Sequence, residues 1–363
     1  MVTAPKTGPE YTVTGIMSGT SLDGADLACC HFSLQRSGWK YRILRAETIP
    51  YPPAIHRKLS ANRRWDRDAA SVIDAELGRF FAFQVNAFHR KYRLNPDMIA
   101  SHGHTIIHRP GIGMTFQAGN GEIMAAETGL TVVSDFRTAD VAQGGQGAPL
   151  VPVGDRLLFG EYGACLNLGG FANISYESQQ GSRIAYDICP ANVALNWLAG
   201  KAGSAFDRGG SIARRGRVID SVLGSLNRLA HYSAPPPKSL GIEWFRGEFI
   251  PLLEPCIARH ADLMATVVEH IGIQIASSLA RASTGPVLVT GGGALNNFLI
   301  ERLEYLTGTR CVIPGRLLVE FKEALVFAFL GVLRIRNEIN CLSSVTGGKK
   351  DLSTGVIYQP EKQ

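Results

Sequence analysis

The sequence lacks any apolar run that approaches the length of a membrane-spanning helix, although 45% of its 363 residues are hydrophobic, as is normal for a globular protein. Its opening residues, MVTAPKTGPEYTV, also lack the apolar core of a signal peptide. We therefore expect no membrane partner, no secretion and a cytoplasmic location.

Cysteine is scarce and irregularly spaced. An odd number of thiols at such spacings does not form a disulfide framework, and reduced thiols in a cytosol fit this pattern better. The seven cysteines are Cys29, Cys30, Cys165, Cys189, Cys256, Cys311 and Cys341.

The positive charge is not concentrated in one region. The net charge of +6 is spread along the chain, and the densest basic patch is Arg214, Arg215 and Arg217. A nucleic-acid footprint needs tighter clustering with interleaved aromatic residues, so we interpret this patch as a solvated face and expect no nucleic-acid partner. A mildly basic surface is compatible with anionic substrates.

Several familiar site motifs are absent. The chain has no phosphate loop of Walker spacing, no GxGxxG, no HExxH and no paired CxxC, so neither a P-loop nor a Rossmann site is indicated. Three histidines within seven residues, His102, His104 and His108, leave a His₃ zinc site as an alternative. That alternative does not explain the glycine turns.

Glycine is abundant at three turns. The first lies in GIMSGTSLDGADLACCHF, from Gly15 to Phe32, where two apolar strands flank a turn rich in glycine and hydroxyl groups. Asp23-Gly24 suits a tight hairpin. Small and hydroxyl residues before it let backbone N–H groups approach an anion such as a phosphate, although an ordinary polar turn is the alternative.

The other two turns follow similar apolar strands. Residues 163–176, GACLNLGGFANISY, repeat the strand–turn–strand pattern around Gly169-Gly170, about 150 residues after the first copy. Gly291, Gly292 and Gly293 follow a strand at 287–289 and precede a helix that we expect near Asn296. A strand, a glycine loop and a helix N-terminus let a nucleotide rest on the backbone.

The length and these repeats predict a two-domain α/β protein, with residues 1–140 plus about 335–363 in one domain and 141–334 in the other. We expect a helix over Ser71–Tyr92, then a strand that ends in a turn at Gly103, and a buried closing helix from Glu323. A ligand would lie in the cleft between the halves.

The three glycine turns together resemble the actin/hexokinase/Hsp70 ATPase fold, in which two duplicated, ribonuclease H-like domains clamp ATP and close by hinge motion. A closer resemblance is to the anhydro-N-acetylmuramic acid kinases. It rests on successive signatures in the family's order: GIMSGTSLDGADLA, SHGHTIIHRP, SDFRTADVAQGGQGAPLVP, LNLGGFANIS, YDICPAN, FDRGGSIARRG, KSLGIEWF, TGGGALNN and SVTGG.

That resemblance implies an enzyme of bacterial peptidoglycan recycling. Such a kinase uses ATP and water to open the 1,6-anhydro ring and phosphorylate O6, which gives N-acetylmuramic acid 6-phosphate and ADP. It implies ATP and Mg²⁺ as cofactors, an anhydro-amino sugar as substrate, and a homodimer.

The resemblance also assigns roles to residues. Asp187, which precedes a helix expected to hold Pro190 in its first turn, falls on the family's catalytic base, although a helix cap is the alternative. Asp23 is of the type that reaches Mg²⁺, or it is simply the turn residue. The expected nucleotide-binding residues are Gly19, Thr20, Ser21, Leu22, Asp23, Gly24, Ala25, Asp26, Gly169, Gly170, Gly291, Gly292 and Gly293.

The expected sugar-binding residues are His102, Gly103, Asp135, Arg137, Asn192 and Glu323. Arg137 could hold the substrate's lactyl carboxylate, or form a structural pair with Asp135. By resemblance Glu323 contacts substrate, and the alternative is a favourable first-turn charge at a helix N-terminus.

The chain departs from the family pattern at three places. YDICPAN replaces a common F/YDTGPGN, Asn120 stands where an aspartate is frequent, and His104 stands where glutamine is common. The first change leaves open a kinase for a different amino sugar, or a nucleotide-binding homologue with impaired catalysis.

Overall fold

The first predicted glycine turn joins two paired strands in the computed structural model, which describes residues 9–19, 22, 24–60, 65–282 and 285–360. Strands β1 (Glu10–Ser18) and β2 (Ala25–Gln35) run antiparallel, from Glu10 opposite Ser33 to Ser18 opposite Ala25. The prediction of a strand–turn–strand unit is therefore confirmed.

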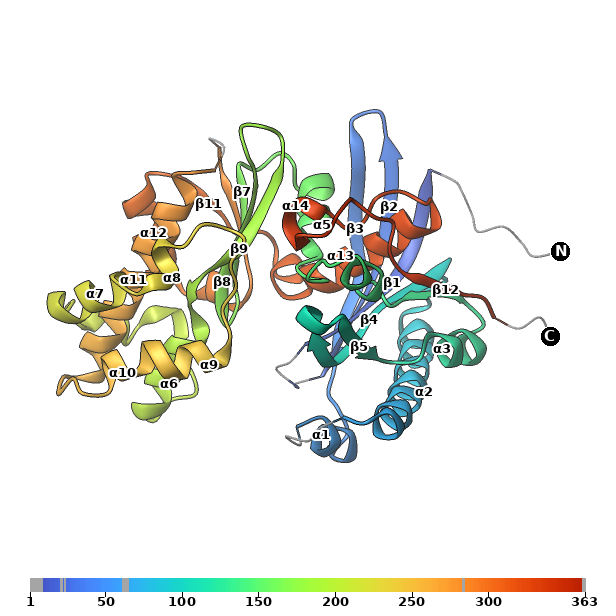
Figure 1. Ribbon diagram of the computed structural model, residues 1–363, viewed down its shortest axis with the longest axis horizontal. Helices are drawn as coiled ribbons and strands as arrows, with labels where there is room; N and C mark the ends of the chain where they lie inside the picture. The colour runs from blue at the N-terminus through green and yellow to red at the C-terminus, as the bar shows by residue number, and fades with distance from the viewer. Residues whose placement is uncertain (1–8, 20–21, 23, 61–64, 283–284, 361–363) are drawn as a thin grey trace. The chain divides into compact units, whose positions relative to one another are not determined.

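The N-terminal sheet extends to both sides of this hairpin (Figure 1). The strand order is β12-β6-β4-β1-β2-β3, and the additional strand β5 pairs with β4. β4 and β6 run parallel to β1, whereas β3, β5 and β12 are antiparallel to their neighbours. The further strands are β3 (Gly38–Ile49), β4 (Met98–Arg109), β5 (Met114–Ala118), β6 (Thr131–Ser134) and β12 (Val356–Tyr358).

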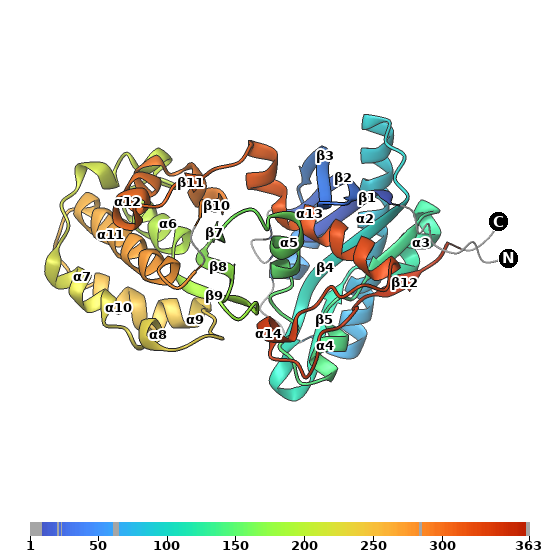
Figure 2. The ribbon, with the colours of Figure 1, turned by 90° about the horizontal axis from the view of Figure 1, so that it is seen from above.

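Helices cover both faces of this sheet. Successive residues of β1 point to opposite faces, so Thr14 meets α2 (Arg67–Tyr92) through a hydrogen bond with His89, and Gly15 packs against α13 (Arg316–Ile335). The helix predicted from Ser71 is α2, which begins four residues earlier behind the N-cap Asp66. Figure 2 shows α2 and α13 on either side of the strands.

The second sheet repeats the topology of the first. Its order, β9-β8-β7-β10-β11, matches β3-β2-β1-β4-β6, with the first three strands antiparallel and the last two parallel to the central one. This confirms the predicted α/β class with two duplicated ribonuclease H-like domains. The strands are β7 (Ala164–Leu168), β8 (Phe171–Glu177), β9 (Arg183–Pro190), β10 (Val287–Thr290) and β11 (Cys311–Val312).

Three helices build the core of the second unit on this sheet. Leu166 and Leu168 of β7 share one buried apolar cluster with residues of α6 (Asn192–Lys201), α11 (His260–Leu279) and α12 (Asn297–Thr307). The shorter helices of the chain are α1 (Pro53–Ser60), α3 (Gly121–Thr128), α4 (Thr138–Ala142), α5 (Val151–Leu158), α7 (Asp220–Asn227), α8 (Ala230–Ser233), α9 (Ile242–Trp244), α10 (Ile250–Leu253) and α14 (Ser343–Thr346).

The chain divides into two units between Leu158 and Phe159 and again between Glu320 and Phe321. The first unit holds the N-terminal sheet and everything after Phe321, including β12, which pairs with β6. Relative to the domain boundaries expected at residues 140 and 334, this division places α5 and most of α13 with the N-terminal sheet.

Three local predictions are corrected. β4 continues through Gly103 to Arg109, because Gly103, with a φ of 72°, lies in a bulge, and at His104 the pairing to β1 resumes and the pairing to β5 begins. α13 begins seven residues before Glu323, which follows a kink at Phe321 rather than starting the helix. Pro190 ends β9 and does not lie in α6.

The structure contains, within its described residues, no helix with both the length and the apolar character needed to cross a membrane.

The close approach of β1 to α13 gives a stability prediction. A Cβ at Gly15 would overlap the carbonyl oxygen of Ala324 and lie 2.9 Å from the carbonyl carbon. Backbone atoms cannot rotate away, so Gly15→Ala should lower the free energy of unfolding by about 1–3 kcal/mol. Urea denaturation measures this, with Gly111→Ala, where nothing lies within 4 Å of the added atom, as the control. Equal urea midpoints for Gly15→Ala and Gly111→Ala would contradict the close approach of β1 to α13.

Candidate active site

Asp187 lies on β9 at a β-bulge. Asn173 of β8 pairs with Asp187 and Ala172 pairs with Cys189, which leaves Ile188 as the extra residue. A bulge changes the direction in which neighbouring side chains point and is common beside active sites. Asp187 is partly buried between the buried residues Tyr186 and Ile188.

A loop from a distant part of the chain holds Asp187 in place. The Asp187 N–H donates to the carbonyl of Lys238 at 3.1 Å, and the Leu240 N–H donates to the Asp187 Oδ2 atom at 2.9 Å. The Nε2 atom of His231 donates to the Asp187 carbonyl at 3.0 Å. Lys238 Nζ in turn donates to the His231 carbonyl at 2.8 Å and lies over the Tyr186 ring. The loop around Lys238 therefore positions the carboxylate of Asp187.

Only one oxygen of the Asp187 carboxylate accepts a hydrogen bond from the described residues. Oδ2 accepts the Leu240 bond, whereas Oδ1 has no hydrogen-bond partner among the residues that the structure describes. Burial raises the pKa of this carboxyl, and the Leu240 bond opposes the increase. The alternative of a helix cap is wrong, because Ala191 occupies the N-cap position of α6 without a side-chain hydrogen bond.

The second and third glycine turns meet at the start of α6. Backbone N–H groups of Ala191 and Val193 donate to the carbonyl of Gly170, and that of Asn192 donates to Gly169. The Asn192 side chain donates to the Leu168 carbonyl at 2.9 Å and lies 3.3 Å from the position of a Cβ on Gly293. Asn192, expected to bind sugar, therefore lies with the loops expected to bind nucleotide.

These glycines are needed for close approach. Gly291 has a φ of 80°, and a Cβ there would lie 2.5 Å from the Asn167 side chain. Gly170 and Gly292, by contrast, leave space around their Cα atoms, with nothing closer to an added Cβ than 3.7 Å. A ligand can therefore approach the backbone of the second turn and of the third.

The first glycine loop is described in part. Thr20, Ser21 and Asp23 lie outside the described residues. Leu22 has a φ of 62°, and a Cβ on Gly24 would collide with the Ile49 carbonyl, so glycine is required where β2 begins. Ala25 is buried in β2, and the next residue, Asp26, accepts a hydrogen bond from Thr48 Oγ1 at 2.6 Å.

His102, within β4, and Arg137, three residues after β6 ends, form a largely buried pair. The Nε and Nη2 atoms of Arg137 lie 3.1 and 2.8 Å from His102 Nε2, and Nη1 donates to the Gly147 carbonyl at 2.6 Å. Burial and the neighbouring Arg137 hold the pKa of His102 well below its usual range, so His102 is a neutral acceptor. Burial lowers the pKa of Arg137 to about 10, which leaves it a cation at neutral pH.

Glu323 belongs to the same region of the first unit. The surrounding protein raises the pKa of its carboxyl by desolvation, and Asp26 raises it further, whereas the Lys322 and Arg137 cations lower it. Glu323 nevertheless keeps contact with solvent. One turn further along α13, the Phe327 ring packs at a tilt against His102, with 4.7 Å between the ring centroids.

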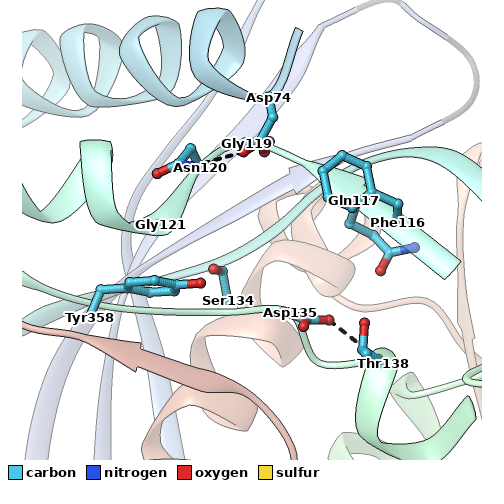
Figure 3. A pocket seen from close by; sticks show the side chains of 10 residues that line it. All are labelled: Asp74, Phe116, Gln117, Gly119, Asn120, Gly121, Ser134, Asp135, Thr138 and Tyr358. Carbon is cyan, nitrogen blue, oxygen red and sulfur yellow. Dashed lines mark hydrogen bonds between the residues drawn. The ribbon is translucent and has the colours of Figure 1, made fainter. Parts of the chain in front are cut away.

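Asp135 lies apart from Arg137. It has a φ of 55°, and its Oδ1 atom accepts from the Thr138 N–H at 3.2 Å rather than from Arg137, so the structural pair expected as an alternative is wrong. Figure 3 shows Asp135 at the edge of a polar pocket of about 110 Å³. Asp74 closes the opposite side by accepting hydrogen bonds from Gly119 and Asn120. Asn120 also caps α3.

A buried carboxylate missed by sequence reasoning joins two of the signature motifs. Asp140 accepts hydrogen bonds from Gly147 N–H at 2.7 Å and Thr346 Oγ1 at 2.8 Å. Gln146 N–H donates to the Thr346 carbonyl. GGQGAPLVP and SVTGG therefore fold together although about 200 residues separate them.

The zinc alternative is not supported. His102 bonds Arg137, His104 bonds Ser18 and the exposed His108 bonds Thr115. No group of three potential metal ligands occurs among the described residues.

Arg214 pairs with Glu301 on the exposed surface, consistent with a solvated basic face.

The desolvated carboxyl of Asp187 predicts a stability change. A raised pKa means that the folded state binds the proton more tightly, so stability is lost as pH rises from the ordinary value of 3.8 through the folded pKa. An amide avoids this penalty and still accepts from Leu240. Asp187→Asn should therefore raise the thermal midpoint at pH 7, with the gain shrinking towards pH 3.

The matched control is Asp220→Asn, an exposed carboxylate at the start of α7 in the same unit. It should show no such gain. A lower midpoint for Asp187→Asn at neutral pH would show that the carboxylate stabilises the loop instead.

Solved structures with similarity to the chain include two that bind nucleotide analogues. One is the activator of the 2-hydroxyisocaproyl-CoA dehydratase from Clostridium difficile with bound ADPNP, 14% identical, with a TM-score of 0.45 over 90% of this chain and 96% of that one. The other is a ROK family glucokinase from Streptomyces griseus in complex with glucose and AMPPNP, 12% identical, with a TM-score of 0.38 over 88% and 98%.

Sequence relatives are closer. A family model for anhydro-N-acetylmuramic acid kinase matches residues 11–360. The chain is 35% identical to the anhydro-N-acetylmuramic acid kinase of Pasteurella multocida (strain Pm70), over 96% of this chain and 97% of that protein. It is 34% identical to the one from Vibrio cholerae serotype O1, over 96% and 98%. These matches confirm the resemblance seen in the motifs, and the chain belongs to the anhydro-N-acetylmuramic acid kinase family.

Proposed function

We propose that this protein is an ATP-dependent kinase that hydrolytically opens 1,6-anhydro-N-acetylmuramic acid and phosphorylates O6, as part of peptidoglycan recycling. The observation that carries the proposal is the carboxylate of Asp187, of which only one oxygen accepts a hydrogen bond from the described residues. It lies in a chain whose family is shown over nearly its whole length. The same family relation supports a cytoplasmic location and a homodimer.

Asp187 is the general base. The Leu240 bond orients the carboxylate through Oδ2, and the open Oδ1 accepts the proton of an attacking water. Burial raises the pKa of this carboxyl, which makes its carboxylate a stronger base than that of an ordinary aspartate.

The chemistry then needs no covalent intermediate. Water oxygen bonds to the anomeric carbon as its proton passes to Asp187, and the bond from that carbon to O6 breaks with its electron pair left on O6. The freed O6 takes the γ-phosphoryl group of ATP, and ADP leaves. The products are N-acetylmuramic acid 6-phosphate and ADP.

Nucleotide binding is assigned to the three glycine turns. Phosphoryl transfer depends mainly on positioning and on neutralising the phosphate charge. Open backbone at Gly170 and Gly292 suits close approach of a nucleotide. Mg²⁺, which neutralises phosphate charge when bound, would be held by Asp23, and Asp26 adds a second carboxylate where β2 begins.

Sugar recognition is assigned to Arg137, with His102 and Glu323 beside it. A guanidinium carries five N–H groups, and the bonds to His102 and Gly147 use three of them, so two remain for a ligand. Glu323 attracts Arg137 from a distance, but no carboxylate forms an ion pair with Arg137 within the described part of the chain. The lactyl carboxylate of the substrate supplies the missing charge.

The central test is release of ADP from Mg-ATP in the presence of 1,6-anhydro-N-acetylmuramic acid. Asp187→Asn should lower kcat by about 10²–10⁴-fold, the usual contribution of a general base. Asp220→Asn, with the same chemical change on an exposed helix start, should retain the parent rate. Turnover that survives in Asp187→Asn would remove this residue as the base.

The same assay separates the alternatives. No turnover with this sugar but turnover with another anhydro-amino sugar would mean that the YDICPAN segment has changed specificity. ATP binding with no turnover on any such sugar would mean an impaired homologue.

Arg137 gives a second, independent prediction. The parent enzyme should prefer 1,6-anhydro-N-acetylmuramic acid over 1,6-anhydro-N-acetylglucosamine, which lacks the lactyl group. Arg137→Met should reduce this preference in kcat/KM by about tenfold or more, because a charge-assisted hydrogen bond is lost.

Purely structural damage would lower kcat/KM for both sugars equally and leave their ratio unchanged. Arg215→Gln, an exposed arginine bonded to the Ser211 carbonyl, is the control and should leave the ratio unaltered. An unchanged ratio in Arg137→Met would assign the lactyl group to another residue.

A further inference from the structure

A chain of three buried side chains ends at His104. Ser18 Oγ lies 2.7 Å from His104 Nδ1 and is also hydrogen-bonded to the hydroxyl of Tyr51. The three residues come from the end of β1, from the segment before α1 and from β4, and the rings of Tyr51 and His104 meet edge to face. None of them belongs to the nucleotide and sugar contacts assigned above.

The direction of these hydrogen bonds follows from counting donors. The phenol hydrogen of Tyr51 has one acceptor among the described residues, the Ser18 oxygen. Tyr51 therefore donates to Ser18, Ser18 uses its own hydrogen for His104 Nδ1, and Nδ1 acts as the acceptor. A neutral imidazole with an accepting Nδ1 carries its proton on Nε2.

The protonation state is stable around neutral pH. Burial lowers the pKa of His104 to about 4. Burial and the nearby Asp26 raise the pKa of Tyr51 to about 12, and the hydrogen bond with Ser18 opposes this rise. Neither end of the chain changes charge between these values. His104 therefore presents a neutral N–H group.

The Nε2–H group of His104 belongs to a residue that pairs with the end of β1. Ser18 is the last residue of β1, directly before the first glycine loop, and it pairs in register with His104. Two residues earlier, His102 bonds Arg137. Nε2 of His104 has no hydrogen-bond partner within the described residues. An N–H group that donates to no described residue is free to donate to an acceptor oxygen of a ligand.

We propose that Tyr51 and Ser18 fix the tautomer of His104 so that its Nε2–H donates a hydrogen bond to an acceptor oxygen of bound substrate. This inference rests on the proposed function. The acceptor is either a phosphate oxygen of the nucleotide or an oxygen of the sugar. In both cases His104 binds substrate directly, and Ser18 and Tyr51 are positioning residues.

Two near-isosteric substitutions test the position of the donor. In Gln the amide nitrogen can take the place of Nε2, whereas the shorter Asn reaches only the place of Nδ1. His104→Ala and His104→Asn should lower kcat/KM by about tenfold or more, and His104→Gln should recover most of that loss. The control is His108→Gln, the same change at an exposed position of the same strand.

The Michaelis constants identify the acceptor. A rise in KM for ATP alone places the acceptor on the nucleotide. A rise in KM for the sugar alone places the acceptor on the sugar. Either result supports the proposal. Equal kcat/KM for His104→Ala and the parent enzyme would overturn it. Equal losses for the Gln and Asn variants would also overturn it, because a merely structural histidine predicts no preference between them.

The tautomer can be measured without any turnover. Long-range ¹H–¹⁵N correlation spectra of histidine-labelled protein distinguish a protonated Nε2 from a protonated Nδ1. We expect Nε2–H for His104 in the parent protein and a mixture of tautomers in Ser18→Ala. Protonated Nδ1 in the parent would overturn the inference even if the kinase is active. Absence of kinase activity with the expected spectrum would instead contradict the proposed function.

Discussion

The pairing of each central strand constrains the rest of the structure. β1 and β7 each pair antiparallel with the next strand and parallel with a later one, β4 or β10. Parallel pairing brings carboxyl ends to the same edge of a sheet, and a hairpin starts from that edge as well. In each unit a glycine turn and a second, distant segment therefore meet: Ser18 with His104 in the first, and Leu168 with Gly291 in the second.

The candidate base illustrates how such a site is kept reactive. Asp187 is partly buried, and none of the described residues forms an ion pair with it. One backbone N–H and a strand bulge orient it, and burial shifts its proton affinity upward. Arg137 is the complementary case, since a partly buried cation is held by a neutral histidine and a carbonyl. Neither charge has an ion-pair partner among the described residues of its own unit, and such charges suit a charged or reacting ligand.

Local features were predictable from the sequence, and distant contacts were not. The three glycine turns, helix α2 and the repeated topology follow from apolar spacing and turn residues within short windows. The strand break at Gly103 was mispredicted because β5 supplies partners that a local reading omits. The links Ser18–His104, Asp187–Leu240 and Asp140–Thr346 span from 53 to 206 positions, and no residue pattern marks them.

The division of the chain also has a consequence for its synthesis. The second unit is one continuous segment, from Phe159 to Glu320, so every strand of its sheet has been made before α13 is complete. The first sheet must wait: α13 covers one of its faces, β12 supplies its edge, and Thr346 completes the bonds to Asp140. On the ribosome, the unit that is begun first is therefore the one that is finished last.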